Sequence, residues 1–217
     1  MLQHSTDELN NLETEKRTNR TPIPIDEYFG EMELTDEQKH DREGLTLLLI
    51  PVFEYIFEVA STLGEDVGLA YLYSLATRRI NDAIRDFNKS FAQTDYVKDT
   101  TITLAQNLVN ATLDHKGDKY YTSHERAVFA AENEANRLCN DFDYENARDG
   151  GYTHKTWIAM NDSHTRATHA EISGVTIPID ELFEVGGSQM RFPMDEQYGA
   201  SAEEIVGCRC SVVYINS

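Results

Sequence analysis

The chain has 217 residues, of which 40% are hydrophobic, and it carries a formal net charge of −19 at pH 7. This length suffices for one sizeable hydrophobic core or two small ones. The negative charge is spread over the whole chain, so no segment offers the basic face that binds nucleic acid phosphates, and we expect no DNA binding from charge. The acidity suits a partner protein with basic patches, or it serves solubility.

Apolar runs in the sequence are short. The longest, LTLLLIPVF at 45–53, is about half of the roughly 20 residues that span a bilayer, and Pro51 interrupts it. The N-terminal stretch MLQHSTDELNNLETEKR has no apolar core and so does not resemble a signal peptide. We therefore expect a protein that is made in a cytoplasm and has no membrane partner.

Residues 1–34 are polar and acidic and include Pro22 and Pro24, a composition that predicts a flexible arm. Residues 35–148 are predicted to form a helical domain, because apolar side chains recur there at helical spacing. The expected helices begin at Thr35 (with Gln38 completing a capping box), after Gly64, after Thr94 and at Thr122; the first is kinked at Pro51 and the last ends near Asn140.

Residues 149–217 are predicted to form a small α+β unit, because the segments beyond Gly150–Gly151 are short and rich in β-formers. The fold class of the whole chain is therefore α+β, with an N-terminal helical domain followed by this unit. Strands are predicted for HKTWIAM, GVTIPI, MRFP and CSVVYI, and single helical turns for IDELF and for SAEEIV, which Ser201 would cap.

An internal echo joins the two ends of the chain. IPIDEYF at 23–29 and IPIDELF at 177–183 agree at six of seven positions. One interpretation is a chance reuse of a strand end followed by a helix cap. The other is that the arm imitates the C-terminal segment and docks in its place on a neighbouring copy, which would give self-association by exchange of like elements.

Histidine and cysteine side chains gather in two stretches of the C-terminal unit. NDSHTRATHAEISG at 161–174 contains His164 and His169, and Cys208 and Cys210 flank Arg209. Thiolates and imidazoles are good zinc ligands, so the two histidines and the two cysteines are the candidate metal ligands. A single residue separates the two cysteines, whereas zinc knuckles use two to four, and the pair would point to opposite faces of a strand.

Three other interpretations of the two stretches are open. A disulfide between Cys208 and Cys210 would close a small, strained ring. A nucleophilic Cys–His pair would need a setting that stabilises the thiolate. A hydrogen-bonded corner would use Arg166 and His169 to brace the loop, with Arg209 doing the same for the last strand. Cys139, alone in a helical pattern, is expected to be buried.

Three motifs follow one another in the last part of the chain: K-x-W at 155–157, D-x-x-x-R-x-x-H at 162–169 and C-R-C at 208–210. Their order and spacing resemble the Mu F-like minor head protein family of tailed phages, the phage head morphogenesis domain. The resemblance covers about 123–213 and includes RAVFAAENEA at 126–135, which is similar to the family's R-A-x-x-I-A-R-T-E helix. Glu132 and Gly207 depart from the family, which often has a basic residue and an Asn there. The matched positions are Glu134, Lys155, Trp157, Asp162, Arg166, His169, Gly174, Phe183, Pro193, Asp195 and Arg209.

The resemblance implies a virion component that passes through the host cytoplasm, joins the portal vertex or the inner capsid surface, and assists DNA packaging or ejection. Its partners would be the portal protein, the major capsid protein or the scaffold. It implies no established catalytic activity and no cofactor, so the matched residues are expected to brace the fold. The alternative is a zinc-dependent hydrolase or toxin-like enzyme, with His169, Cys208 and Cys210 as ligands and Asp162 or Glu134 as the base.

Overall fold

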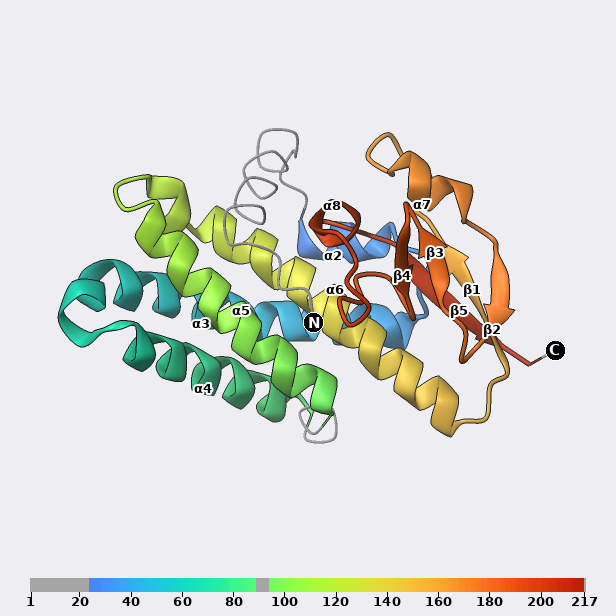
Figure 1. Cartoon of the computed structure of the whole chain (residues 1–217), viewed down its shortest axis with the longest axis horizontal. Coiled ribbons are helices and arrows are strands. Elements are labelled where there is room, and N and C mark those ends of the chain that lie inside the picture. The colour runs from blue at the N-terminus through green and yellow to red at the C-terminus, as the bar shows by residue number, and fades with distance from the viewer. Residues whose placement is uncertain (1–23, 89–93, 217) are drawn as a thin grey trace. The chain divides into compact units, whose positions relative to one another are not determined.

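The computed structural model describes residues 24–88 and 94–216 and has the predicted α+β class (Figure 1). The chain divides into two compact units, one comprising Met1–His40 and Asn136–Ser217 and the other Asp41–Ala135. These limits fall inside two long helices, whereas the predicted limits at 34/35 and 148/149 lie where the amino-acid composition and the spacing of apolar residues change. The predicted limits stay a prediction.

Long helices make up the unit Asp41–Ala135. The first, α3, begins at Asp36, where Gln38 N–H donates to Thr35 Oγ1 (3.2 Å) and Thr35 N–H donates to Gln38 Oε1 (3.0 Å), which confirms the predicted capping box. The bounds are α3 (Asp36–Val67), α4 (Leu69–Phe87), α5 (Asp95–Asp114), the short 3₁₀ helix η2 (Lys119–Thr122) and α6 (His124–Asp149).

The first predicted helix end was wrong. Helix α3 continues past Pro51 and Gly64 and ends at Val67. The next residue, Gly68, has a φ of 77°, in the left-handed region that glycine adopts readily. Gly64 has a packing role instead, because a Cβ there would lie 2.5 Å from Leu113 Cδ2. A glycine in a helical pattern can therefore mark close packing of another helix and not a helix end.

Helices α5 and α6 follow the predicted starts closely. Thr94 accepts a hydrogen bond from Val97 N–H (3.2 Å), which confirms it as the N-cap of α5. Helix α6 begins at His124 and is capped by Ser123, one residue after the predicted Thr122; the Ser123 hydroxyl accepts a hydrogen bond from Arg126 N–H (3.1 Å). It also extends beyond Asn140 to Asp149, and this last part buries Tyr144 and Ala147.

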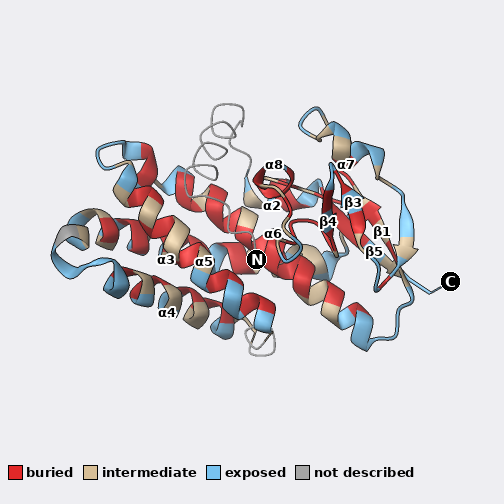
Figure 2. Ribbon diagram, in the orientation of Figure 1, coloured by how far each residue is buried: buried red, intermediate tan, exposed pale blue. Residues whose placement is uncertain are grey.

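Helix α3 is, by length and composition alone, able to cross a membrane. Within Asp36–Gly64, a window of 18 residues has a mean hydropathy of 1.6, and 44% of that window is buried in the fold. This stretch includes isolated acidic residues such as Glu54, which end the uninterrupted apolar run at 45–53 but lower the mean hydropathy only slightly. The core helix of a soluble protein passes the same test, and α3 places Leu45, Leu49 and Phe53 fully in the core (Figure 2).

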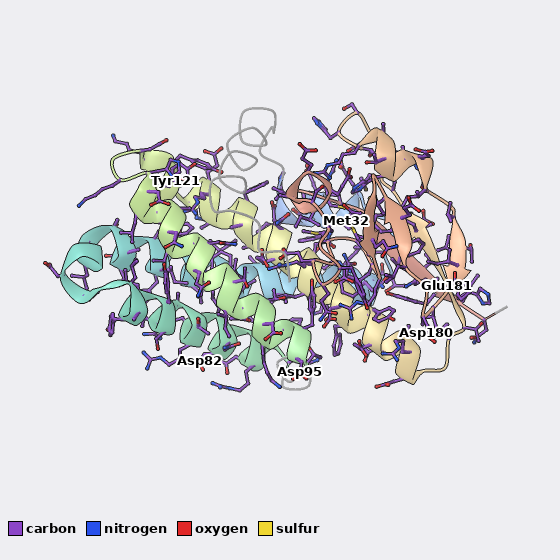
Figure 3. The ribbon with its side chains drawn as sticks, viewed as in Figure 1. Met32, Asp82, Asp95, Tyr121, Asp180 and Glu181 are labelled. Carbon is purple, nitrogen blue, oxygen red and sulfur yellow. The ribbon has the colours of Figure 1, made fainter. Side chains whose placement is uncertain are left out.

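A buried arginine lies within the helical unit. Arg126 on α6 is fully buried, with its guanidinium 4.3 Å from the ring centroid of Phe57 and 5.0 Å from that of Tyr121 (Tyr121 is labelled in Figure 3). Its Nη1 donates to Thr112 Oγ1 (3.0 Å) and to the Tyr121 carbonyl (2.9 Å). These contacts join α3, α5, η2 and α6.

The other unit contains a three-stranded antiparallel sheet in the order β2-β1-β5 and a β3–β4 hairpin. IDELF is not the predicted helical turn: Phe183 begins β3, and Gly186 and Gly187, with φ of 57° and 82°, form the turn to β4. The bounds are α2 (Ile25–Gly30), β1 (His154–Ile158), α7 (Ala167–Glu171), β2 (Thr176–Pro178), β3 (Phe183–Val185), β4 (Ser188–Met190), α8 (Ala202–Ile205) and β5 (Ser211–Ile215).

Strand β1 directs two matched residues into the core of this unit. Its burial alternates, so Lys155 and Trp157 are fully buried while their neighbours are partly exposed. Trp157 is paired with Val212 and Lys155 with Tyr214 on β5. The central strand therefore fixes the positions from which both side chains reach the core.

The two copies of the echo have different structures. Residues 1–23 of the predicted arm lie outside the described residues, but Ile25–Gly30 form helix α2, which buries Tyr28 and Phe29. The second copy instead forms strand β2, a turn and the start of β3, with Asp180 and Glu181 in the turn (Figure 3). One local sequence thus adopts two conformations in this chain, and self-association by exchange of like elements stays a hypothesis.

Replacing Arg126 with Ala should lower the free energy of unfolding by about 2–4 kcal/mol, because it opens a cavity and leaves the Tyr121 carbonyl without its donor. The control is Arg85→Ala on α4, which removes an exposed ion pair with Asp82 and should cost less than about 1 kcal/mol. Urea denaturation followed by circular dichroism measures both. Equal losses in the two variants would contradict the role of Arg126.

Candidate functional site

A buried cluster of His169, Cys208 and Cys210 forms in the C-terminal part of the chain. His169 lies on α7 and the two cysteines lie just before β5, and the three side chains expose only 2%, 1% and 3% of their surface. The His169 Nδ1 atom is 3.2 Å from Cys210 Sγ and 3.5 Å from Cys208 Sγ. The structure therefore brings together the three residues that the metal and nucleophile hypotheses share.

The loop before α7 is a compact turn around Asp162. Its Oδ1 accepts hydrogen bonds from His164 N–H and from Thr165 Oγ1, both at 2.9 Å. Helix α7 follows at once and turns His169 inward. His164 itself remains exposed and does not join the cluster.

Two arginines tie this loop to the segment before β5. Arg166 Nη2 donates to the Val206 carbonyl (2.5 Å). Arg209 forms an ion pair with Asp162 and donates to Glu31 Oε2 (3.2 Å), close after α2. The cysteines and the histidine are thus held from both sides by the arginine contacts that the corner hypothesis described.

Glu204 on α8 completes the cluster. Its Oε2 accepts a hydrogen bond from His169 Nε2–H (2.9 Å) and another from Thr168 Oγ1 (2.9 Å). Because Nε2–H points at the carboxylate, Nδ1 is the nitrogen that faces the sulfurs. It carries the lone pair when His169 is neutral, and it carries an N–H that donates to a Cys208 thiolate when the ring is protonated. Nothing in the sequence distinguishes Glu204 from the adjacent Glu203, although the first is buried and the second is exposed in the structure.

The cluster shifts the pKa values of all three groups. Burial alone would raise the pKa of Cys208, but hydrogen bonds with Cys210 and His169 lower it well below the usual thiol value. The hydrogen bond with Cys208, together with burial, raises the pKa of Cys210 well above that value. For His169, burial lowers the pKa, but the bond to Cys208 and its negative charge raise it overall. The cluster therefore stabilises one thiolate, on Cys208.

Aromatic side chains enclose the cluster. The Trp157 ring lies edge-on to the His169 ring, with centroids 5.6 Å apart, and edge-on to Phe183 at 5.2 Å. The Trp157 indole partly opposes the rise in the pKa of Cys210. Of the two matched aromatic residues, Trp157 thus packs directly against His169, and Phe183 packs against Trp157.

Gly174 and Gly207 occupy positions that require backbone freedom. Gly174, with φ of 84°, follows α7 and donates its N–H to the Trp157 carbonyl at 2.7 Å. Gly207 has φ of 67°, in the left-handed region that glycine and asparagine adopt most readily. The family's Asn and this chain's Gly can therefore fill the same backbone conformation immediately before Cys208.

Helix α6 donates hydrogen bonds to the segments that carry Cys208 and Pro193. Asn136 donates to the Cys208 carbonyl and Asn140 to the Pro193 carbonyl, both at 3.1 Å. Asp195 is fully buried and accepts two hydrogen bonds from the Arg191 guanidinium, at 2.7 Å and 3.1 Å. These are bracing contacts. Glu134, also on α6, is buried in the other unit, as is Glu132.

Lys155 is a buried amine in an aromatic cage. Its Nζ has no hydrogen-bond partner among the described residues and lies 5.0 Å from the Tyr144 ring centroid and 5.2 Å from that of Phe183. Burial, assisted by the positive charge of Arg191, lowers its pKa from 10.5 to about 8. The ammonium is therefore held at a cost to the folded state.

Lys155 should make the stability of the protein rise with pH. Between the folded pKa of about 8 and the unfolded value of 10.5, the unfolded chain binds more protons, so raising the pH favours folding; below about 8 the full penalty is present. From pH 7.5 to 9.5, the free energy of unfolding of the wild type should gain about 2 kcal/mol relative to Lys155→Met. Urea denaturation of both proteins at each pH measures this difference. Contributions from titratable groups that the two proteins share cancel in it. Parallel pH profiles would contradict the buried charge.

Gly186 and Gly187 provide a matched pair for testing the Glu204 contact. Both have positive φ, but a Cβ on Gly186 would overlap the Glu204 carboxylate, whereas one on Gly187 would meet nothing within 4 Å. Gly186→Ala should therefore destabilise the protein by at least about 1 kcal/mol more than Gly187→Ala, whose cost is backbone strain alone. Thermal unfolding of both variants measures the difference. Equal shifts would show that Glu204 has room to move.

The chain is similar in sequence to known proteins. The family described as Phage Mu protein F like protein matches residues 82–213, which include every matched position from Glu134 to Arg209. A relative is the NAD(+)–arginine ADP-ribosyltransferase EFV of Enterococcus faecalis (strain ATCC 700802 / V583), which is 33% identical over 97 residues. That alignment covers 43% of this chain but only 19% of the relative's length. No solved structure matches.

The family match covers more than half of the chain, and within it the motifs quoted from the sequence have the internal contacts described above. The chain therefore belongs to the Phage Mu protein F like family and is a phage head morphogenesis protein.

Proposed function

We propose that this protein is a minor head protein of a tailed phage, incorporated at the portal vertex or the inner capsid surface during head assembly, where it assists DNA packaging or delivery. The observation that carries the proposal is the family match over residues 82–213. Head morphogenesis proteins act through other head proteins, and we propose the portal protein as the main partner, with the major capsid or scaffold protein as further ones.

The contacts of the matched residues support a binding role and not a catalytic one. Trp157, Lys155 and Asp195 are fully buried, and Arg166 and Arg209 bind a carbonyl group and carboxylates of the same chain. Side chains committed to such contacts are not available to a substrate. We therefore propose that the exposed surface recognises the partner, and that the buried motif residues do not contact it.

The charge of the chain supports the choice of partner. A net charge of −19 repels packaged DNA and attracts a basic protein surface, and both effects weaken as salt rises. A protein that works close to DNA without adhering to it benefits from this sign of charge. We therefore propose a salt-sensitive contact with a basic surface of the portal.

The zinc-dependent hydrolase is the weaker candidate. His169, Cys208 and Cys210 are each at most 3% exposed, so a metal held by them lies beyond the reach of a substrate in this conformation. The ADP-ribosyltransferase relative does not strengthen an enzyme role, since this chain corresponds to 19% of that protein's length. We propose that the shared part is the Mu F-like region and that the activity in the relative's name resides elsewhere in it.

Purified portal should co-sediment with this protein at low salt, and the bound fraction should fall at moderate salt, because opposite charges attract less when screened. Two matched double variants divide the surface: Asp86→Lys with Asp99→Lys changes the helical unit, and Glu181→Lys with Glu184→Lys changes the other. All four residues are exposed, and each variant changes the net charge equally.

We expect one double variant to weaken binding several-fold more than the other, which identifies the unit that meets the portal. The protein sedimented alone, without portal, serves as the control for non-specific pelleting. A wild-type protein that stays in the supernatant at both salt concentrations would refute portal binding.

A further inference from the structure

We infer that His169, Cys208 and Cys210 bind a zinc ion, with Glu204 orienting the histidine from outside the coordination shell. This inference concerns the fold of the C-terminal part and does not rest on the proposed role in the phage head. The three donors come from α7 and from the segment before β5, so the ion would join two pieces of chain about 40 residues apart in sequence.

The spacing of the donor atoms fits a tetrahedral ion. With Zn–S bonds of about 2.3 Å and Zn–N bonds of about 2.0 Å, tetrahedral angles place sulfur and nitrogen about 3.5 Å apart and two sulfurs about 3.8 Å apart. His169 Nδ1 lies 3.2 Å and 3.5 Å from the two sulfurs, and all three donor atoms lie within 4.8 Å of one another. An ion can therefore enter with small side-chain adjustments and no change of backbone.

The contacts of Glu204 are an independent sign of a ligating histidine. Histidines that bind metals usually donate their other ring N–H to a carboxylate, which fixes the tautomer and raises the basicity of the ligating nitrogen. His169 donates Nε2–H to Glu204 Oε2 at 2.9 Å, and Thr168 donates to the same oxygen at 2.9 Å. The lone pair on Nδ1 is then directed at the thiols, where the ion would lie.

The single residue between the cysteines is compatible with shared coordination. Alternate residues of a strand point to opposite faces, but β5 begins at Ser211, so Cys208 and Cys210 precede the regular strand. Gly207, with its positive φ, turns the chain just before them. Both sulfurs approach the same nitrogen, and the backbone N–H of Cys210 also donates to Cys208 Sγ at 3.4 Å.

The type of donor favours zinc and a structural role. Thiolate and imidazole together suit zinc, whereas calcium and magnesium prefer oxygen ligands. The number of protein donors, three, leaves the fourth tetrahedral position to water or a further donor. The structural role rests on burial: the three donors are at most 3% exposed and Trp157 packs against His169, so the ion would be out of reach of a substrate and would stabilise the fold. Binding only to the folded chain would raise its thermal stability.

The first test measures metal in the whole protein, purified with a reductant and without added metal or chelator. Elemental analysis should give about one zinc per chain. Protein stripped with a chelator should melt at a lower temperature and recover on addition of zinc. It should also bind Co²⁺ with the intense near-ultraviolet absorption of thiolate-to-cobalt charge transfer, a readout that requires sulfur ligands.

Variants assign the site. His169→Ala, Cys208→Ser and Cys210→Ser should each lose the metal or bind it far more weakly. Cys139→Ser, which removes a buried cysteine on α6 outside the cluster, should keep it. Glu204→Gln should retain all three ligands but weaken Co²⁺ binding about 10–100-fold, as for other carboxylates that orient a ligating histidine.

Metal uptake by the wild-type protein tests zinc binding even if a ligand variant fails to fold. Stripped, reduced protein that takes up neither zinc nor cobalt would overturn it. Metal that persists in all three ligand variants, or that is lost in Cys139→Ser alone, would place the ion elsewhere and would overturn it equally.

Discussion

The His169 imidazole is the contact on which the C-terminal part of this protein depends. One ring nitrogen donates to Glu204 and the other faces the sulfurs of Cys208 and Cys210, with the Trp157 ring packed against it. A buried polar group of this kind is stable only when every partner is in place. The Arg166 and Arg209 contacts position the segment that carries the cysteines, so the family's D-x-x-x-R-x-x-H and C-R-C motifs act as one structural unit.

This arrangement explains why residues of the family motif that are chemically like catalytic ones are engaged in internal contacts. Asp195 is held by the guanidinium of Arg191, Trp157 fills the core, and Lys155 is enclosed by aromatic rings. A motif made of such residues specifies a fold, and the exposed acidic surface remains free to specify the partner. Polar residues of this type resemble catalytic ones in sequence, and only their burial and partners distinguish the two.

Local signals predicted much of the fold. The capping box at Thr35, the N-cap at Thr94 and the strand that contains Trp157 were each visible in a few consecutive residues. The errors arose where distant contacts decide the outcome. Gly64 packs against Leu113, and the two copies of the echo take different structures because different surroundings bury them. The three cluster residues were candidates from their chemistry, but Glu204 was missed because only the fold turns it toward His169.

Native-state hydrogen exchange tests most directly whether the His169 cluster holds the C-terminal part together. We expect His169→Ala to speed exchange of the β1 and β5 backbone amides strongly, because those strands flank the cluster, while amides of α4 and α5 in the other unit keep their protection. Unchanged protection in β1 and β5 would contradict the central role given to His169. A uniform loss across α4 and α5 as well would show that the cluster has no local effect.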